Sequence, residues 1–303
     1  MRLGLYLPQL PQALSAIDLW ESNLRWSVEW LSIYQAWQSP YSGFYSRELR
    51  AIHKTGRTAL ITWEPWELPV SGKPLQDQTK FSLKRILAGD YDDYIWTWAK
   101  ASKSLALPYL LRPMHEMNGN WYPWCGTVNG NQPHEYVETW RYLHKIFQAA
   151  GATQVSWVWC PYAASFPQWH NNSILCYYPG DAYVDWIALD GYNWGYTQSG
   201  SRWQTFEELF SPGYENVTRL TDRPLLLAEI ASAETGGNKS LWIRSAFEAL
   251  IQSFDRVEGL VWFNTKKECD WRIDSSEDAL LSFKEGLQSC SERKTGRTGL
   301  EVK

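Results

Sequence analysis

The sequence predicts a single closed (β/α)8 barrel, an α/β fold of eight parallel strands with helices on the outside. Eight short apolar runs alternate with stretches of helical periodicity along the 303 residues, and continuous apolar strands are typical of a parallel sheet that is covered on its outside. The chain is longer than one average domain but ordinary for such a barrel. No glycine-rich phosphate loop follows the first apolar run, which disfavours an open dinucleotide-binding sheet.

The first half of the chain carries four strand–helix units. The first strand ends at Pro8, which has no N–H to donate. In the third helix apolar residues recur near a period of 3.6 from Tyr91 to Leu105, with Asp90 as the expected N-cap. The third strand is expected to run into a loop at 64–67. The expected strands are 3–7, 30–36, 58–63 and 109–114, and the expected helices are 13–24, 47–54, 91–105 and 134–150.

The second half continues the alternation of strands and helices, and it contains no internal sequence repeat and no linker. The helix at 134–150 stops at Gly151, the residue type that most readily ends a helix. Residues 291–303 are polar and aperiodic, so we expect one domain at 1–290 followed by a disordered tail. The remaining expected strands are 155–159, 186–189, 224–228 and 259–263, and the remaining helices lie around 206–210 and at 240–254 and 277–287.

Composition excludes several classes of partner. The net charge of −4 and the absence of Lys/Arg runs argue against nucleic acid. Five cysteines without a CxxC pair make a metal cage or a disulfide framework unexpected, although one bridge stays open, and we expect no cofactor. No stretch has the apolar length of a membrane span. The start is too short and too proline-broken for a signal peptide, so we expect an intracellular protein unless the chain was trimmed.

Twenty Trp and seventeen Tyr exceed what a core needs, and this excess is typical of a carbohydrate cleft or of a tryptophan-heavy core. The stretch 110–124 concentrates it: an apolar strand breaks at Met114 and is followed by His115, Glu116, Gly119 and three aromatic residues. A carboxyl group held against apolar surface has a raised pKa, as a general acid requires. The alternative is a helix-capping carboxylate. A zinc metalloprotease helix is excluded, because Gly119 stands where H-E-x-x-H needs its second histidine.

Residues that follow the strands of such a barrel share one cleft. Glu116 and Glu229 each end an apolar strand, the fourth and the seventh, which lie on opposite sides of the barrel. Two carboxyl groups that face each other in this way are what glycoside hydrolysis needs. The alternative for Glu229 is a buried ion pair with Arg112. The strand-end residues are Trp37, Trp63, Glu64, His115, Glu116, Trp159, Tyr192, Glu229 and Trp262.

The segment 112–121, RPMHEMNGNW, resembles the acid/base signature of glycoside hydrolase family 26, the β-mannanase-like family. Six further segments resemble other blocks of that family: WEP at 63–65, WVW at 157–159, LDGYN at 189–193, LAEI at 227–230, VWFN at 261–264 and WRID at 271–274. The resemblance therefore runs from about residue 3 to residue 287. It implies a retaining mechanism, with Glu116 as the acid/base and Glu229 as the nucleophile.

The resemblance also implies roles for the neighbours of the two acids. His115 would orient the acid/base, and Tyr192 would hydrogen-bond the nucleophile, although a core histidine and a packing tyrosine are the alternatives. Trp121 and Trp262 would line the sugar sites nearest the cleaved bond. Trp63 and Trp159 are the other expected substrate-binding residues, and no metal is expected.

The expected substrate is a β-linked polysaccharide, and the expected enzyme is a monomeric endo-β-mannanase. Mannanases of the family carry a Trp-His pair after the third strand, where this chain has Trp63 and Glu64. Mixed-linkage β-1,3-1,4-glucan is therefore a close second substrate, and β-1,3-xylan is a more remote one. A non-catalytic sugar-binding barrel and an interaction protein with an exposed apolar patch are the alternatives from other classes.

Overall fold

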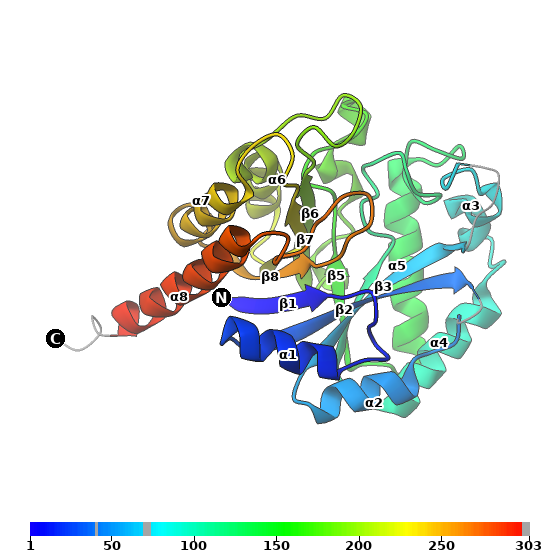
Figure 1. Ribbon diagram of the computed structural model, residues 1–303. Coiled ribbons are helices and arrows are strands. Elements are labelled where there is room, and N and C mark those ends of the chain that lie inside the picture. The colour runs from blue at the N-terminus through cyan, green and yellow to red at the C-terminus, as the bar shows by residue number, and fades with distance from the viewer. Residues whose placement is uncertain (40–41, 69–73, 299–303) are drawn as a thin grey trace.

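The structure is a computed structural model that describes residues 1–39, 42–68 and 74–298, with side chains of the last helix only as far as residue 291. Eight parallel strands form a closed barrel in sequence order, and β1 pairs with β8 to close it (Figure 1). The strands are β1 Arg2–Tyr6, β2 Val28–Gln38, β3 Thr58–Glu67, β4 Tyr109–Pro113, β5 Val155–Trp159, β6 Trp186–Asn193, β7 Leu225–Ser232 and β8 Val257–Phe263. The predicted fold class is confirmed.

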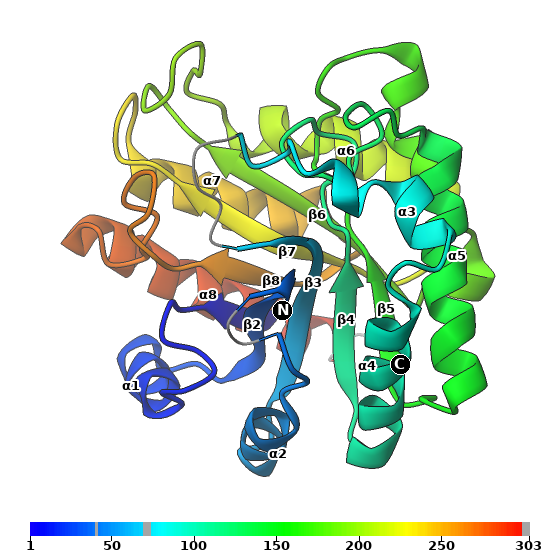
Figure 2. The same cartoon turned by 90° about the vertical axis from the view of Figure 1, so that its right-hand side faces the viewer.

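Helices cover the outside of the barrel, and the strands point towards the end where α3 lies (Figure 2). The helices are α1 Ser15–Leu24, α2 Ser46–Lys54, α3 Leu83–Leu87, α4 Asp92–Leu105, α5 Pro133–Ala150, α6 Phe206–Leu220, α7 Lys239–Gln252 and α8 Glu277–Thr298. Gly151 ends α5 with a φ of 78°, as predicted. Helix α8 continues to Thr298, where the sequence predicts a tail from residue 291; residues 299–303 lie outside the described part. No described helix has the length and apolarity that crossing a bilayer requires.

Three strands, β3, β6 and β7, run four residues further at their carboxyl ends than the sequence predicts. The expected loop at 64–67 belongs to β3, because β2 runs beside it and pairs Ala36 with Glu64 and Gln38 with Glu67. Strands β6 and β7 extend each other in the same way as far as the pair Asn193 and Ser232. Glu229 therefore lies within β7 rather than after it. Helix α4 begins at Asp92, and Tyr91 rather than Asp90 occupies its N-cap position.

The interior of the barrel is a small apolar cluster that draws residues from β2 to β8. Trp30 fills its amino-terminal end, and a Cβ at Gly259 would lie only 2.6 Å from Trp30 Cζ3, so glycine makes room for the indole. The Arg2 guanidinium covers the rings of Trp30 and Trp186, with its central carbon 5.7 and 5.8 Å from their centroids. The cluster consists of Trp30, Leu60, Leu110, Val158, Cys160, Ala188, Leu226, Ala228 and Val261. This end of the barrel is closed, which leaves the opposite end for a site.

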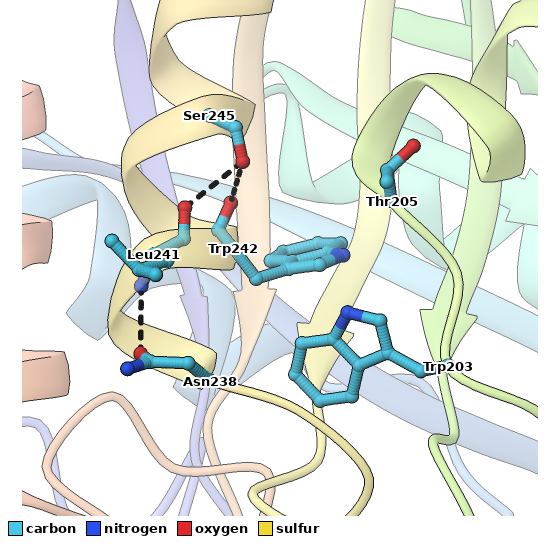
Figure 3. Close-up of a pocket in the computed structure, with 6 residues that line it drawn as sticks. All are labelled: Trp203, Thr205, Asn238, Leu241, Trp242 and Ser245. Atoms are coloured by element: carbon cyan, nitrogen blue, oxygen red, sulfur yellow. Dashed lines mark hydrogen bonds between the residues drawn. The ribbon is translucent and has the colours of Figure 1, made fainter.

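Helices α6 and α7 begin side by side and leave a shallow surface pocket between them (Figure 3). The polar side chains of this pocket serve the helix ends. Thr205 Oγ1 accepts from the Glu208 N–H at 3.1 Å, and Asn238 Oδ1 accepts from the Leu241 N–H at 3.0 Å. Ser245 Oγ donates to a carbonyl of its own helix. The pocket contains neither of the two predicted catalytic carboxyl groups.

Candidate active site

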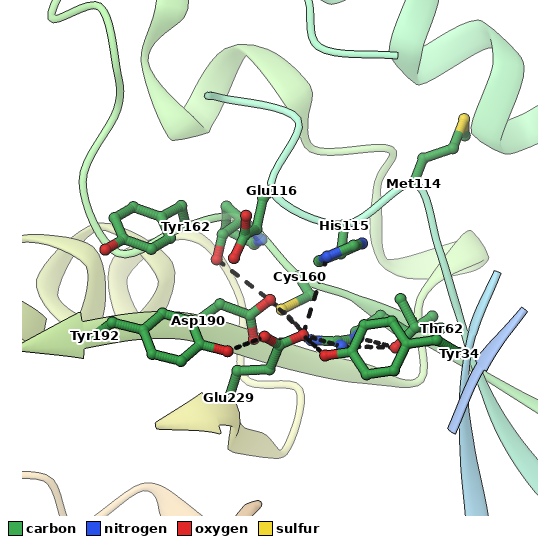
Figure 4. A network of polar contacts seen from close by, with 12 residues as sticks. Tyr34, Thr62, Met114, His115, Glu116, Cys160, Tyr162, Asp190, Tyr192 and Glu229 are labelled. Atoms are coloured by element: carbon green, nitrogen blue, oxygen red, sulfur yellow. Dashed lines mark hydrogen bonds and ion pairs between the residues drawn. The ribbon is translucent and has the colours of Figure 1, made fainter. Parts of the chain in front are cut away.

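An ion-pair network occupies the carboxyl end of the barrel (Figure 4). Arg112, on β4, is fully buried. Its Nη1 lies 2.8 Å from both carboxylate oxygens of Asp190 on β6, and its Nη2 donates to Glu229 Oε1 on β7. Nε and Nη2 also donate to Thr62 Oγ1, at 3.1 and 2.6 Å. The guanidinium is thus paired with two carboxyl groups and a hydroxyl, as a buried charge requires.

Glu229 receives hydrogen bonds on both carboxylate oxygens. The Tyr34 hydroxyl and Arg112 Nη2 donate to Oε1, and the Tyr192 hydroxyl donates to Oε2. The three donors come from β2, β4 and β6, so side chains from several strands fix the position of this carboxylate. The ion pair with Arg112 that the sequence offered as an alternative is present, and it belongs to the network at the carboxyl end of the barrel.

A local irregularity in strand pairing aims Glu229 inward. Leu227 lies opposite Leu189, but Glu229 lies opposite Asp190, so β7 has one extra residue at this point. Ala228 packs inside the barrel, and strict alternation would turn the next side chain outward. The extra residue restores the inward direction, as β-bulges do beside active sites.

Glu116 lies just past β4 on a backbone in an unusual conformation. Met114 and Glu116 have φ values of 50° and 54°, in the left-handed region that favours glycine. The Glu116 N–H donates to the Cys160 carbonyl at 2.8 Å, which ties the turn to the end of β5. The side chain is 5% exposed, and its Oε2 accepts from Trp121 Nε1 at 2.6 Å. Burial first, and then the negative charge of Glu229, raise the pKa of Glu116 to about 8.

Trp121 reaches Glu116 because Gly119 has no side chain. The indole packs directly over this glycine, where a Cβ would lie 2.5 Å from Trp121 Cζ2. The Gly119 N–H donates to the Glu116 carbonyl at 2.9 Å, so the turn, the indole and the carboxyl group form one compact unit.

His115 lies between the two acids but bonds to neither. Its Nε2 is 3.9 Å from Glu229 Oε1. Neither ring nitrogen has a hydrogen-bond partner among the described residues. Burial first, and then the charge of Arg112, hold the pKa of His115 well below its usual value, which favours the neutral ring. The ring packs against Tyr122 at a centroid distance of 4.7 Å. Within the described part of the chain, no hydrogen bond joins His115 to Glu116.

Three predicted sugar-binding tryptophans point away from the cleft. Trp63 packs against Trp98 of α4, with centroids 5.0 Å apart. Trp159 Nε1 donates to the Tyr177 carbonyl at 3.1 Å, and Trp262 Nε1 donates to the Trp271 carbonyl at 2.8 Å. All three indoles are buried in the layer between strands and helices. A position at the end of a strand shows that a residue lies near the mouth of the barrel, but it does not show whether the side chain points into the barrel or towards the helices. These three residues are therefore not part of the proposed site.

Sequence reasoning missed four residues that the structure brings to the cleft: Tyr6, Tyr34, Asp190 and Phe263. Phe263 rather than Trp262 faces inward on β8, and its ring stacks on Tyr6 with centroids 4.5 Å apart. Asp190 follows an apolar run, which is the signal that identified Glu116. Tyr34 could have been found by counting every second residue from Trp30 along the apolar run.

One group of described residues has metal-binding side chains close together. The ligand atoms of His115, Glu116 and Asp190 lie within 4.8 Å of one another. The donor set does not fit a cation, because both oxygens of Asp190 already bind the positive Arg112 guanidinium. We therefore assign no step to a metal.

Eight parallel strands with carboxyl groups from β4 and β7 at one cleft define a class of protein, the barrel glycoside hydrolases. Comparison with family models gives the family. The model of glycosyl hydrolase family 26 matches residues 70–249, and the chain belongs to this family.

Individual relatives carry different names. Endoglucanase H of Acetivibrio thermocellus is 37% identical over 287 residues, which are 92% of this chain but 28% of that protein. A mannan endo-1,4-beta-mannosidase of Bacillus subtilis strain 168 is 28% identical over 138 residues, 44% of this chain and 33% of the relative. The chain thus matches only about a third, or less, of these relatives' length. The catalytic domain of an endo-beta-1,4-mannanase from Bacillus sp. JAMB-750 has the same fold, with a TM-score of 0.69 and 18% identity over 95% of this chain and 85% of that one.

Proposed function

We propose that the protein is a retaining endo-β-glycanase in which Glu229 is the nucleophile and Glu116 the acid/base. The observation that carries the proposal is the difference between the surroundings of the two acids. Glu229 accepts hydrogen bonds from Arg112, Tyr34 and Tyr192, the environment that a negatively charged nucleophile needs. Glu116 has one indole donor and a raised pKa, the environment of a carboxyl group that holds its proton.

The two acids act in sequence. In the first step Glu229 attacks the anomeric carbon while Glu116 donates its proton to the departing glycosidic oxygen, which leaves as a hydroxyl. The glycosyl ester on Glu229 has no charge, so the pKa of Glu116 remains raised by burial but no longer by the charge of Glu229. Glu116, now ionised, removes a proton from water, the water attacks the anomeric carbon, and Glu229 leaves as a carboxylate.

The polar neighbours hold this geometry. Tyr34 and Tyr192 position the carboxylate of Glu229 from two sides, and Arg112 balances its charge. His115, whose lowered pKa favours the neutral ring, lies close to both acids without adding charge. Trp121 holds Glu116 through its indole N–H and can offer a ring face to a sugar.

The proposed substrate is a β-1,4-linked polysaccharide, with β-1,4-mannan first. Relatives named mannan endo-1,4-beta-mannosidase, from Bacillus subtilis and other bacteria, support mannan. A β-glucan is the second candidate, and one observation favours it. Endoglucanase H matches far more of this chain at higher identity, although its name describes a much longer protein. Burial first, and then the charge of Glu229, raise the pKa of Glu64 on β3 to about 8. By the resemblance described above, this residue replaces the histidine of the mannanases, so the resemblance to them is incomplete at this position.

A panel of mannan, galactomannan, lichenan, cellulose and β-1,3-xylan tests the proposal through the oligosaccharides released. We expect internal cleavage of one β-1,4-containing polymer and a β-anomer as the first product in proton NMR, because Glu229 must touch the anomeric carbon directly. An α-anomer formed first would contradict the nucleophile assignment. Binding of sugars without any turnover would instead indicate a non-catalytic barrel.

Substitution of Gly119 by Ala should slow the enzyme without unfolding it. The new Cβ would displace the Trp121 indole and remove its hydrogen bond to Glu116. We expect kcat/KM on the polysaccharide to fall on the order of 10- to 100-fold, as small displacements of a catalytic group cause. Gly43→Ala is the matched control, since a Cβ at Gly43 meets no atom of the described residues within 4 Å. Unchanged kinetics for Gly119→Ala would show that the indole does not hold the acid.

A further inference from the structure

Two large aromatic side chains lie in solvent on the segment that follows β5. Phe166 is 56% exposed and Trp169 is 58% exposed, three residues further along the chain. Exposed aromatic rings can bind a ligand or a partner, because their faces are apolar. Phe166 lies beside Trp121, the residue that donates to Glu116, so the segment adjoins the site and points to a ligand of that site.

Buried asparagines hold this segment against the turn that carries Glu116. Asn118, two residues after the acid, donates through Nδ2 to the Tyr162 carbonyl at 2.9 Å and accepts through Oδ1 from the Tyr162 N–H at 2.8 Å. The Phe166 N–H donates to the Asn118 carbonyl at 2.8 Å. Phe166 therefore has a fixed position relative to Glu116.

Asn172 closes the other side of the segment. Its Nδ2 donates to the carbonyls of Asn118 and Pro167, at 2.9 and 2.8 Å, and its Oδ1 accepts from the Tyr177 hydroxyl. The Asn172 N–H donates to the Trp169 carbonyl at 2.9 Å. Both asparagines are completely buried. The exposed rings thus stand on an ordered support, which lowers the entropic cost of binding a ligand.

The rings continue the site in one direction. Trp121 donates to Glu116, and its ring lies nearly parallel to that of Phe166, with centroids 6.5 Å apart and an interplanar angle of 30°. An acid/base contacts the glycosidic oxygen, whereas the nucleophile contacts the sugar that keeps its anomeric carbon. Rings that extend from the Glu116 side therefore adjoin the part of the substrate that leaves.

We propose that Phe166 and Trp169 form a sugar-binding platform for the leaving-group half of the polysaccharide, beyond the sugar that Trp121 contacts. This inference rests on the proposed function and deepens it, because it assigns a second length of the glycan chain to a defined surface. The occupant is a β-linked glycan, whose axial C–H groups stack on aromatic faces.

Phe166→Ala, Trp169→Ala and the double variant test the platform on two substrates. One is a soluble polysaccharide, and the other is an activated aryl β-glycoside, in which the aryl group replaces the whole leaving-group half. We expect the ratio of kcat/KM on the polysaccharide to that on the aryl glycoside to fall about 3- to 10-fold for each variant. Leu175→Ala is the matched control, because Leu175 belongs to the same segment, is 49% exposed and has no ring.

The site of cleavage gives a second readout. The preferred cleavage position in an end-labelled oligosaccharide should move towards the reducing end when binding on the leaving-group side is lost. Fewer sugars then have to bind on the leaving-group side. An unchanged ratio and cleavage pattern in an active enzyme would overturn the platform and leave the proposed function intact. A loss equal on both substrates, or shared by Leu175→Ala, would also overturn it. A wild type that hydrolyses neither substrate would overturn the proposed function instead.

Discussion

Replacing Glu229 by Ala should abolish turnover, with a fall in kcat of about 10⁴-fold or more, as for the covalent nucleophiles of other enzymes. The substitution removes the atom that attacks the anomeric carbon. The fold should persist, because Arg112 keeps its contacts with Asp190 and Thr62 and is not left unpaired. The measurements are kcat on the polysaccharide and the thermal midpoint of unfolding.

Azide distinguishes loss of the nucleophile from general damage to the site. A small anion can enter the space of the missing carboxylate and attack the anomeric carbon of an activated aryl glycoside, which should restore turnover and form an α-glycosyl azide. Glu258→Ala is the matched control, since this exposed glutamate stands towards the opposite end of the barrel, on β8. Turnover of the polysaccharide by Glu229→Ala at near the wild-type rate would refute the assignment.

Replacing Glu116 by Ala should affect substrates according to their leaving groups. A sugar alkoxide cannot leave without a proton, so we expect kcat/KM on the polysaccharide to fall on the order of 10²- to 10⁴-fold. An activated phenolate needs no proton, and the first step on such an aryl glycoside should be nearly unchanged. Pre-steady-state kinetics measure that step separately. Equal losses on both substrates would contradict the acid/base role.

The raised pKa of Glu116, about 8, adds a pH dependence to this prediction. The acid form is lost as pH rises through that value, so kcat/KM on the polysaccharide should decline above about pH 8 in the wild type. The same proton affects stability, since an unfolded glutamate has a pKa of about 4.3. The stabilisation that the folded protein gains from holding this proton is fully present below about pH 4.3 and is lost as pH rises towards 8. Glu116→Gln should remove the part of this slope that Glu116 contributes to the free energy of unfolding, while Glu64, whose pKa burial also raises to about 8, keeps its own part.

The barrel could be predicted from the sequence because each strand is a continuous apolar run between turn residues. The ends of β3, β6 and β7 could not, since a strand continues for as long as its neighbour offers hydrogen bonds. Glu64 and Glu67 pair with β2 although neither is a typical strand residue. That partnership depends on which segments lie side by side, which the local sequence does not contain.

The candidate site was only partly predictable for a related reason. Glu116 and Glu229 stand out in the sequence as acids at the ends of apolar runs. The sequence predicted Trp262 as a sugar-binding residue, but Trp262 packs against α8, and Phe263 packs against Tyr192 of the site. Alternation from Val261 inside the barrel would have identified Phe263. The same count would have failed at Glu229, because the extra residue of β7 reverses the alternation there. The contact of Tyr34 with Glu229 joins residues 195 positions apart, and only the closed barrel brings them together.

The left-handed backbone at Met114 and Glu116 places thermal stability and catalytic activity in conflict in this protein. Each such residue costs about 1–3 kcal/mol relative to a relaxed conformation, and glycine or asparagine would relieve part of that cost. At position 116 either replacement deletes the acid, so selection for heat resistance alone would favour an inert barrel. Attempts to raise thermal stability should therefore leave this turn untouched and replace Arg25 or Ala106 instead, the left-handed residues that end helices α1 and α4, where glycine removes no catalytic group.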